Sequence, residues 1–182
     1  GQCGDLSAML RRMLVLSGPL LALAGCGFAL RQAPKFVFRS IYLQLPESTS
    51  LGPVLTRALR MNPDLQVLTE VAQRASADVI LDIRSEQREK VVAGLNAAGQ
   101  VREFVLRLRL RFRLITPAGR ELIPETELLL QREFGFAETA ALAKEEEESL
   151  LNRDMRQDMV QQLMRRLAAV SSLTAGSQLP ER

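Results

Sequence analysis

Hydrophobic and polar residues alternate most strictly in the segment VLRLRLRFRL, which covers residues 105–114. Alternation with a period of two is typical of a β-strand that has one apolar and one polar face. The same pattern predicts three long strands in succession, which are 77–92, 101–115 and 121–136. Every polar position of 105–114 is an arginine, and we call these residues the arginine ladder: Arg107, Arg109, Arg111 and Arg113.

The connections between these strands predict the neighbours of the arginine ladder. A loop at 94–99 and a tight turn at 116–120, where Gly119 is free to take a positive φ, make both strand pairs antiparallel. The first strand is expected to place its charged residues on the face of the ladder: Asp82, Arg84, Glu86, Arg88 and Lys90. The third is expected to place Glu125, Glu127 and Glu133 on one face and Thr126, Leu128, Leu130 and Phe134 on the other. Pro124 indicates an edge or a bulge early in the third strand.

Apolar residues at helical spacing predict two helices. One begins after the N-cap types Ser48–Ser50, has Pro53 in its first turn and stops at Asn62-Pro63. A strand over 36–45 precedes this helix and a short strand over 65–68 follows it, which favours a parallel crossover. The other helix covers 139–173, with Met155, Met159 and Met164 as core residues. The predicted fold is α+β, with a single mixed, mostly antiparallel β-sheet and two α-helices packed on one face.

Composition narrows the possible functions. The chain of 182 residues has a formal net charge of +3, no His, no Trp, one Tyr and only two Cys. The commonest general base and metal ligand are therefore missing, and no nucleotide-binding or nucleophile motif is present. Aromatic residues are too few for a nucleic-acid stacking surface. We expect no enzyme activity, no catalytic residue, no metal site and no nucleic-acid partner.

The arginine ladder itself has two interpretations. The turn at 116–120 places Arg111 near Glu125 or Glu127, and Arg109 near Glu127 or Leu129, so the ladder could be the salt-bridged solvent face of a sheet. Arginine, and never lysine, stands at all four positions, however, and its planar guanidinium binds phosphate in a bidentate manner. A polyanion with several phosphates could therefore bind there, and the sequence leaves both interpretations open.

The N-terminal segment predicts secretion. A basic start, Met9-Leu-Arg-Arg-Met13, leads into an apolar run from Leu14 to Leu23 and then into Ala24-Gly25-Cys26. This order is typical of a signal peptide, whereas the run is too short to span a bilayer. A buried core helix is the alternative. Residues 1–8 are interpreted as an upstream extension, 9–25 as the signal, 26–173 as one α/β domain and 174–182 as a disordered tail.

The segment Leu23-Ala24-Gly25-Cys26 resembles the bacterial lipoprotein box. The resemblance implies cleavage before Cys26 and an N-acyl diacylglyceryl group on that residue, with no other cofactor. Gly27 stands where an Asp retains such proteins at the inner membrane. The resemblance therefore implies an outer-membrane lipoprotein on the periplasmic side.

From Cys26-Gly27-Phe28-Ala29-Leu30-Arg31 through the long C-terminal helix, the chain resembles the lipopolysaccharide-assembly lipoprotein family, LptE. The resemblance implies a small domain that plugs the LptD outer-membrane β-barrel, assists its assembly and binds lipopolysaccharide during transport to the outer leaflet. The candidate contacts with lipopolysaccharide or the barrel come from the residue pattern: Arg84, Arg88, Lys90, Arg107, Arg109, Arg111 and Arg113. The alternatives are an adaptor or pilotin of another envelope machine and an anchored hydrolase that uses carboxylates.

Overall fold

The computed structural model of the protein describes residues 34–136 and 141–173. The chain divides into two units, Gly1–Gln32 and Ala33–Arg182, and all the described residues belong to the second. The predictions for the signal, the lipoprotein box with Cys26 and the tail 174–182 lie outside the described residues. No helix among the described residues is long and apolar enough to cross a membrane.

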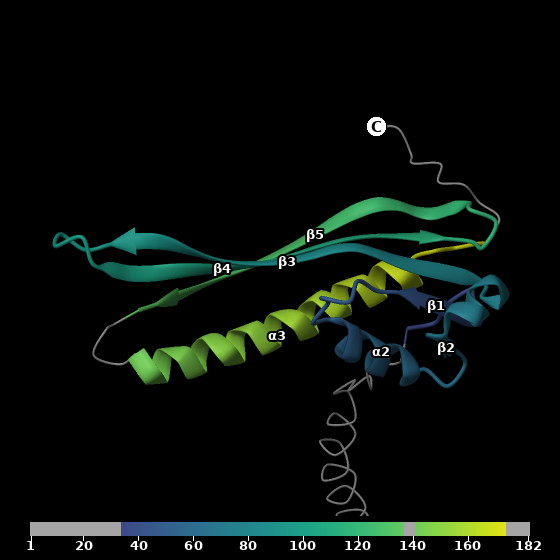
Figure 1. The fold of residues 1–182 in the computed structure, drawn as a ribbon, viewed down its shortest axis with the longest axis horizontal. Coiled ribbons are helices and arrows are strands. Elements are labelled where there is room, and N and C mark those ends of the chain that lie inside the picture. Colours follow the sequence, from purple (N-terminus) through teal and green to yellow (C-terminus); the bar gives the residue numbers. More distant parts are fainter. Residues whose placement is uncertain (1–33, 137–140, 174–182) are drawn as a thin grey trace, which may run out of the picture. The chain divides into compact units, whose positions relative to one another are not determined.

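One mixed sheet organises the described domain (Figure 1), and its strand order is β2-β1-β3-β4-β5. β1 runs parallel to both β2 and β3, whereas β3, β4 and β5 are antiparallel neighbours. The predicted α+β class and the mixed, mostly antiparallel sheet are therefore confirmed. The elements are β1 (Ser40–Gln44), α2 (Gly52–Arg60), β2 (Gln66–Leu68), η2 (Val71–Ser76), β3 (Val79–Leu95), β4 (Val101–Ile115), β5 (Glu121–Gly135) and α3 (Ala141–Ala168).

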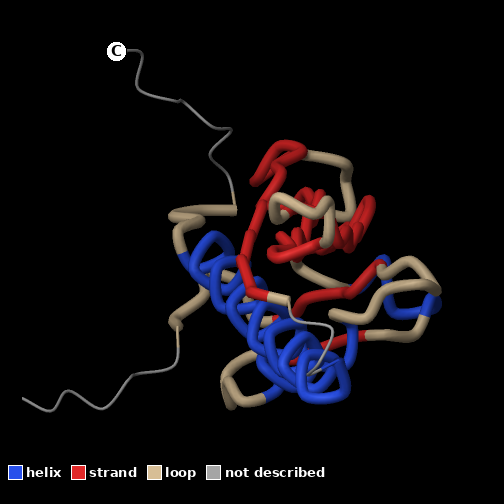
Figure 2. Tube along the Cα trace, turned by 90° about the vertical axis from the view of Figure 1, so that its left-hand side faces the viewer, coloured by secondary structure: helices blue, strands red, loops and turns tan. Residues whose placement is uncertain are grey.

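Both α-helices pack on the same face of the sheet, which we call the helix face (Figures 1 and 2). Leu55 and Leu59 of α2 share one apolar core with the buried positions of the strands and of α3. The predicted stripe of α3 is confirmed, because Met155, Met159 and Met164 are all buried. Helix α3 ends at Ala168, five residues before the predicted end.

β1 is shorter than predicted, because it begins at Ser40 instead of residue 36. The carboxylate of Asp78 accepts hydrogen bonds from the backbone N–H groups of Arg39 and Ser40, at 2.8 and 3.0 Å. A side chain therefore takes the place of a strand partner there, and the pairing with β3 begins only at Ile41. The alternation of the sequence does not indicate that a side chain replaces the neighbouring strand at this point.

Within the described residues, the opposite face is covered only at the β1 end. There Tyr42, Leu68, Ala77, Ile80 and Ile115 form a second apolar cluster. The middle of β1 and the beginning of β3 are thus buried on both faces, as parallel strands usually are. Beyond residue 84 of β3 the sheet has three strands, and one of its faces is polar.

A β-bulge at Arg84 changes which face the rest of β3 presents. Ile83 pairs with Phe112 and Ser85 pairs with Arg111, so Arg84 is an extra residue on β3. One extra residue exchanges the two faces of all that follows it. The prediction that Glu86, Arg88 and Lys90 share the face of the arginine ladder is therefore wrong. Their cross-strand partners are Leu110, Leu108 and Leu106, which are buried on the helix face.

The bulge also explains how α2 begins. The predicted Ser and Thr side-chain caps are wrong, since the N-cap residue Leu51 makes no side-chain cap bond. Instead, the carboxylate of Glu86 accepts hydrogen bonds from the N–H groups of Ser50 and Leu51, at 2.9 and 3.1 Å, and from the hydroxyls of Thr49 and Ser50. A negative charge at a helix N-terminus is favourable, and the Pro53 predicted for the first turn is there.

The predictions for the last hairpin are confirmed. Gly119 has a φ of 86° in the turn between β4 and β5. Pro124 lies in β5, which is an edge strand whose register with β4 shifts nearby. An edge position suits proline because it has no N–H to donate to a neighbouring strand.

Candidate functional site

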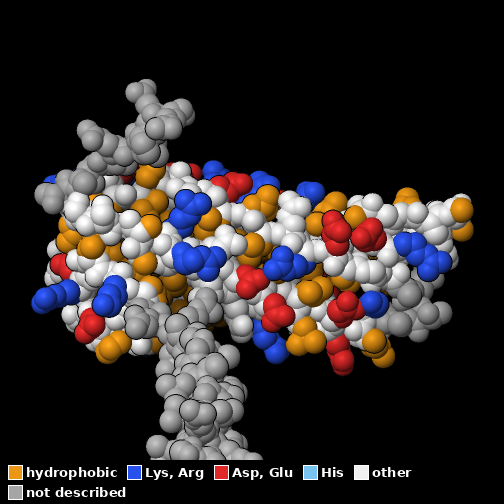
Figure 3. Space-filling model, turned by 180° about the vertical axis from the view of Figure 1, so that it is seen from behind, with side chains coloured by type: hydrophobic (Ala, Val, Ile, Leu, Met, Phe, Trp, Pro, Cys, Tyr) orange, Lys and Arg blue, Asp and Glu red, His pale blue; other side chains and the backbone are white. Residues whose placement is uncertain are grey.

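The arginine ladder lies on the face of the sheet opposite α3, which we call the ladder face. Register places carboxylates and amides on both sides of it, because β3 and β5 flank β4. Figure 3, which views the domain from behind Figure 1, shows acidic and basic side chains interspersed on that side. On the ladder face, the charged and polar neighbours of the arginines are Asp82, Arg84, Ser85, Gln87 and Glu89 from β3, and Glu125, Glu127, Gln131 and Glu133 from β5.

At the β1 end, Arg113 is held by a buried carboxylate. Asp82 is only 2% exposed, and its Oδ2 atom lies 2.8 Å from Nε of Arg113 and 3.4 Å from Nη1 of Arg84. The amide of Gln44 donates to the other carboxylate oxygen at 3.1 Å. A buried charge needs such partners, and removing one of them leaves the other uncompensated. Arg113 and Asp82 therefore form a structural pair.

In the middle of the ladder, the ion pairs are longer and more exposed. Arg111 lies 3.5 Å from Glu125, and Arg109 lies 3.5 Å from Glu127, with every side chain between 37% and 48% exposed. These are two of the cross-strand neighbours predicted from the turn at 116–120. Exposed pairs of this kind contribute about 0.2–1 kcal/mol. They hold the guanidinium groups loosely and leave them accessible.

Arg107 ends the row differently, since it makes no ion pair with any described residue. Its cross-strand neighbours are Glu89 and Gln131. Its Nε atom is buried and has no hydrogen-bond acceptor within the described part of the chain. The partners of the guanidinium groups thus change along the ladder. Arg113 is held by a buried carboxylate, whereas Arg107 has no ion pair within the described residues.

Arg88 and Lys90, also predicted as contacts, lie on the helix face because of the bulge. The Lys90 ammonium pairs with Glu148 of α3 and stands 4.4 Å from the ring centroid of Phe104 and 5.6 Å from that of Phe134. Arg88 is exposed, and no ion pair joins it to the described residues. Lys90 fixes β3 to α3, whereas Arg88 is available to a ligand.

Two carboxylates with clear roles were not predicted from the sequence. Glu148 was not singled out in the sequence, and Glu86 was assigned to the wrong face. Partial burial alone would raise the pKa of Glu86, but the hydrogen bonds from Ser50, Thr49 and Leu51 together hold it below its ordinary value. Only the position of the bulge, which the sequence does not mark, could have revealed either contact.

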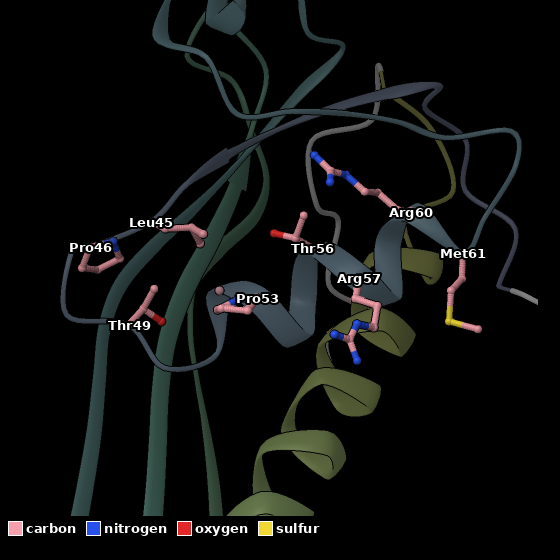
Figure 4. Close-up of a pocket in the computed structure, with 9 residues that line it drawn as sticks. Leu45, Pro46, Thr49, Pro53, Thr56, Arg57, Arg60 and Met61 are labelled. Carbon is pink, nitrogen blue, oxygen red and sulfur yellow. The ribbon is translucent and has the colours of Figure 1, made fainter.

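Two hollows lie away from the ladder. One, of about 740 Å³, is formed by the β1–α2 loop and α2 (Figure 4). The other, of about 890 Å³, is formed by residues 34–39 and 62–65, and Asp64 is the single carboxylate that lines it. Among the described residues there is no group of three or more Cys, Asp or Glu that could hold a metal ion. Neither hollow brings two carboxylates together, so the carboxylate hydrolase gains no support.

The fold and the ladder face define a small α+β domain that buries one face of its sheet under helices and presents guanidinium groups on the other. The model of the LptE family, described as lipopolysaccharide-assembly, matches residues 38–167. The chain therefore belongs to the LptE family of lipopolysaccharide-assembly lipoproteins, as its resemblance implied.

Curated relatives and solved structures agree with this assignment. The chain is 30% identical over 161 residues to the LPS-assembly lipoprotein LptE of Pectobacterium atrosepticum, covering 87% of this chain and 85% of the relative. It is 32% identical over 159 residues to that of Yersinia enterocolitica, covering 87% and 75%. The solution structure of a lipoprotein B from Nitrosomonas europaea is similar with a TM-score of 0.68 and 33% identity, over 79% of this chain and 91% of that one.

Proposed function

We propose that this lipoprotein is anchored in the outer membrane through acylated Cys26, plugs the LptD β-barrel and binds lipopolysaccharide on its way to the outer leaflet. Membership of the lipopolysaccharide-assembly family supports the process. The relatives carry the name LPS-assembly lipoprotein, which supports an envelope location. A polar, charged sheet face suits a domain that sits in the polar interior of a large barrel.

The observation that carries ligand binding is the gradient along the arginine ladder. Arg107 forms no ion pair within the described residues, and Arg109 is held only by an exposed pair of 3.5 Å. Alternate residues of a strand are about 7 Å apart on one face, so these two guanidinium groups can meet separate phosphate groups of one ligand. We assign the phosphates of lipid A to this pair, with Arg88 as a contact on the other face.

Arg113, Arg84 and Lys90 serve the fold in this proposal. Arg113 and Arg84 satisfy the buried Asp82, and Lys90 joins β3 to α3. Arg111 is intermediate, because it donates a hydrogen bond to Ser85 at 3.3 Å and forms an ion pair with Glu125 at 3.5 Å. The seven candidate contacts thus separate into cations whose interactions stabilise the fold and cations that are available to a ligand.

The test measures lipopolysaccharide capture by the purified domain with Arg107→Glu and with the control Arg153→Glu. Arg153 is an exposed arginine of α3 away from the ladder, so both variants change the charge equally. A charge-assisted hydrogen bond contributes about 1.5–3 kcal/mol, so Arg107→Glu is expected to weaken binding about tenfold or more. Equal affinities of the two variants would remove the ladder from the binding site.

Barrel binding needs a separate measurement. Affinity purification of the acylated protein from membranes, followed by mass spectrometry, should recover an outer-membrane β-barrel with lipopolysaccharide. Recovery of a secretion ring instead would favour the adaptor or pilotin alternative. The same mass spectra report whether Cys26 carries the diacylglyceryl and acyl groups.

A further inference from the structure

A second group of cations, separate from the arginine ladder, surrounds the point where the described chain begins. The Asn62 side-chain amide donates to the carbonyl of Pro34 at 2.7 Å, and Asn62 is only 8% exposed. This bond fixes residue 34 beside the end of α2. The exposed residues around it form what we call the basic patch: Lys35, Val37, Arg39, Arg57, Arg60 and Met61.

Alternation in the first described residues turns their cations outward. Phe36 and Phe38 stack on each other with ring centroids 5.1 Å apart, and Phe38 is buried in the core. Lys35, Val37 and Arg39 therefore point to solvent, and all three are exposed.

Helix α2 supplies the other half of the basic patch. Arg57 and Arg60 are exposed, line the hollow of about 740 Å³ and are drawn with Met61 in Figure 4. The hollow of about 890 Å³ lined by Lys35 and Arg39 also contains Asn62, the residue after Met61. Met61 and Asn62 are consecutive residues, so both hollows are lined in part by residues at the end of α2.

The charge of this surface is only partly compensated by the domain, because the carboxylates near it are Asp64, in the lining of one hollow, and Asp78, which accepts from the backbone N–H of Arg39. None of its four cations forms an ion pair with a described residue. The linings of the two hollows contain a single carboxylate, Asp64. On the ladder face, by contrast, three of the four arginines form ion pairs with carboxylates.

Exposed apolar side chains stand among these cations. Met61 is 76% exposed and Val37 is 44% exposed. Basic residues mixed with exposed apolar ones are typical of surfaces that lie at a membrane interface, where the cations meet anionic headgroups and the apolar groups enter the acyl boundary.

The length of the chain before residue 34 limits the distance to the bilayer. Seven residues, 27–33, lie between Cys26 and Pro34, and the eight Cα–Cα steps of that stretch span at most about 28 Å when fully extended. With acylated Cys26 in the bilayer, a step that rests on the proposed function, the surface around residue 34 lies nearest to the anchor. We propose that the basic patch docks on anionic phospholipid headgroups of the leaflet that holds the anchor.

The test uses the acylated protein in vesicles of phosphatidylcholine with and without phosphatidylglycerol. A fluorophore is attached through Met61→Cys, or through Leu129→Cys as a control on the ladder face, where Leu129 is 41% exposed. The thioether of acylated Cys26 does not react, so each label is unique. Quenching by brominated acyl chains reports contact between the label and the bilayer.

The label at Met61 is expected to be quenched in vesicles with phosphatidylglycerol, and the label at Leu129 is not. Each basic residue close to an anionic surface changes binding about fivefold. Arg57→Gln combined with Arg60→Gln should therefore reduce the docked population roughly tenfold or more, whereas Arg153→Gln with Arg156→Gln on α3 should leave it unchanged. High salt should also release the label, because the Debye length falls from roughly 8 Å to roughly 3 Å.

Equal quenching of the two labels, or equal quenching of Met61 with and without phosphatidylglycerol, would overturn the docking. If the barrel still co-purifies in that case, only the docking fails, and an acidic surface of a protein partner becomes the better occupant. A protein that lacks acyl groups on Cys26 would overturn the anchor and the docking together.

Discussion

The two ends of the β3–β4 strand pair differ although both strands keep polar residues on the ladder face. At the β1 end, both faces of the sheet are covered, and the buried Asp82 is paired with Arg113. At the other end, beyond the bulge at Arg84, only the helix face is covered, and Arg107 has no carboxylate partner among the described residues. Equivalent positions of one alternating pattern therefore perform different tasks.

Burial explains the difference. When a guanidinium leaves a buried carboxylate, an uncompensated charge remains in a medium of low dielectric constant, which is unfavourable. A guanidinium on an open sheet exchanges one weak partner for another at little cost in free energy. The β1 end thus holds the fold together, and the open end can bind a ligand without weakening it.

Among the substitutions that test this comparison, Asp82→Ala is expected to have the largest effect on stability. The substitution leaves Arg113 and Arg84 without their buried acceptor, and Arg113 is one-third exposed, so the domain should lose about 2–3 kcal/mol. Urea unfolding at an unchanged m-value measures the loss. Asp158→Ala is the control, because Asp158 pairs with Arg132 while both are about half exposed, and it should cost less than about 1 kcal/mol. Equal losses of stability would show that the ion pair at the β1 end contributes no more to folding than an exposed ion pair on the surface.

The next effect concerns Glu86, which links the bulge to the N-terminus of α2. Its pKa is lower in the folded protein than the ordinary value of 4.5. The carboxylate therefore stabilises the fold above its ordinary pKa, and this stabilisation is lost as the pH falls through the lower pKa of the folded state. Glu86→Gln should cost about 1 kcal/mol near neutral pH.

Urea midpoints measured from neutral pH down to about pH 3 test this assignment. The difference between the parent protein and Glu86→Gln should stay constant near neutrality and shrink in acid. Glu89→Gln is the matched control on the same strand, because Glu89 is exposed and forms no ion pair within the described residues. A difference that grew in acid would contradict the lowered pKa.

Much of the site could be predicted from the sequence where a short turn determines the register. The turn at 116–120 correctly placed Arg111 near Glu125 and Arg109 near Glu127. The bulge could not be predicted, because Arg84 differs in no local property from its neighbours. Its cause is tertiary, since it lets Asp82 reach Arg113 on one face and Glu86 reach α2 on the other.

Lys90 and Arg88 lie on the same strand and the same face, and substitutions of these two residues should differ in stability by a smaller amount. Lys90→Met removes the pair with Glu148 and the contact with the Phe104 ring, so it should cost about 1 kcal/mol. Arg88→Met should stay within about 0.5 kcal/mol. Both values come from urea unfolding, and lipopolysaccharide capture by the two variants should follow the opposite order. A larger loss of stability for Arg88→Met would mean that the assignment of structural and available cations is reversed.

The smallest effect is the most informative about the ladder itself. A double-mutant cycle with Arg109→Ala and Glu127→Ala should give a coupling free energy of about 0.2–0.5 kcal/mol, because both side chains are exposed and their charged atoms are 3.5 Å apart. The coupling should decrease as salt is added. At this strength a phosphate group can displace Glu127 from Arg109 with little loss. A coupling above about 1 kcal/mol would place Arg109 with Arg113, as part of the fold, and would leave Arg107 as the ladder's sole candidate for the ligand.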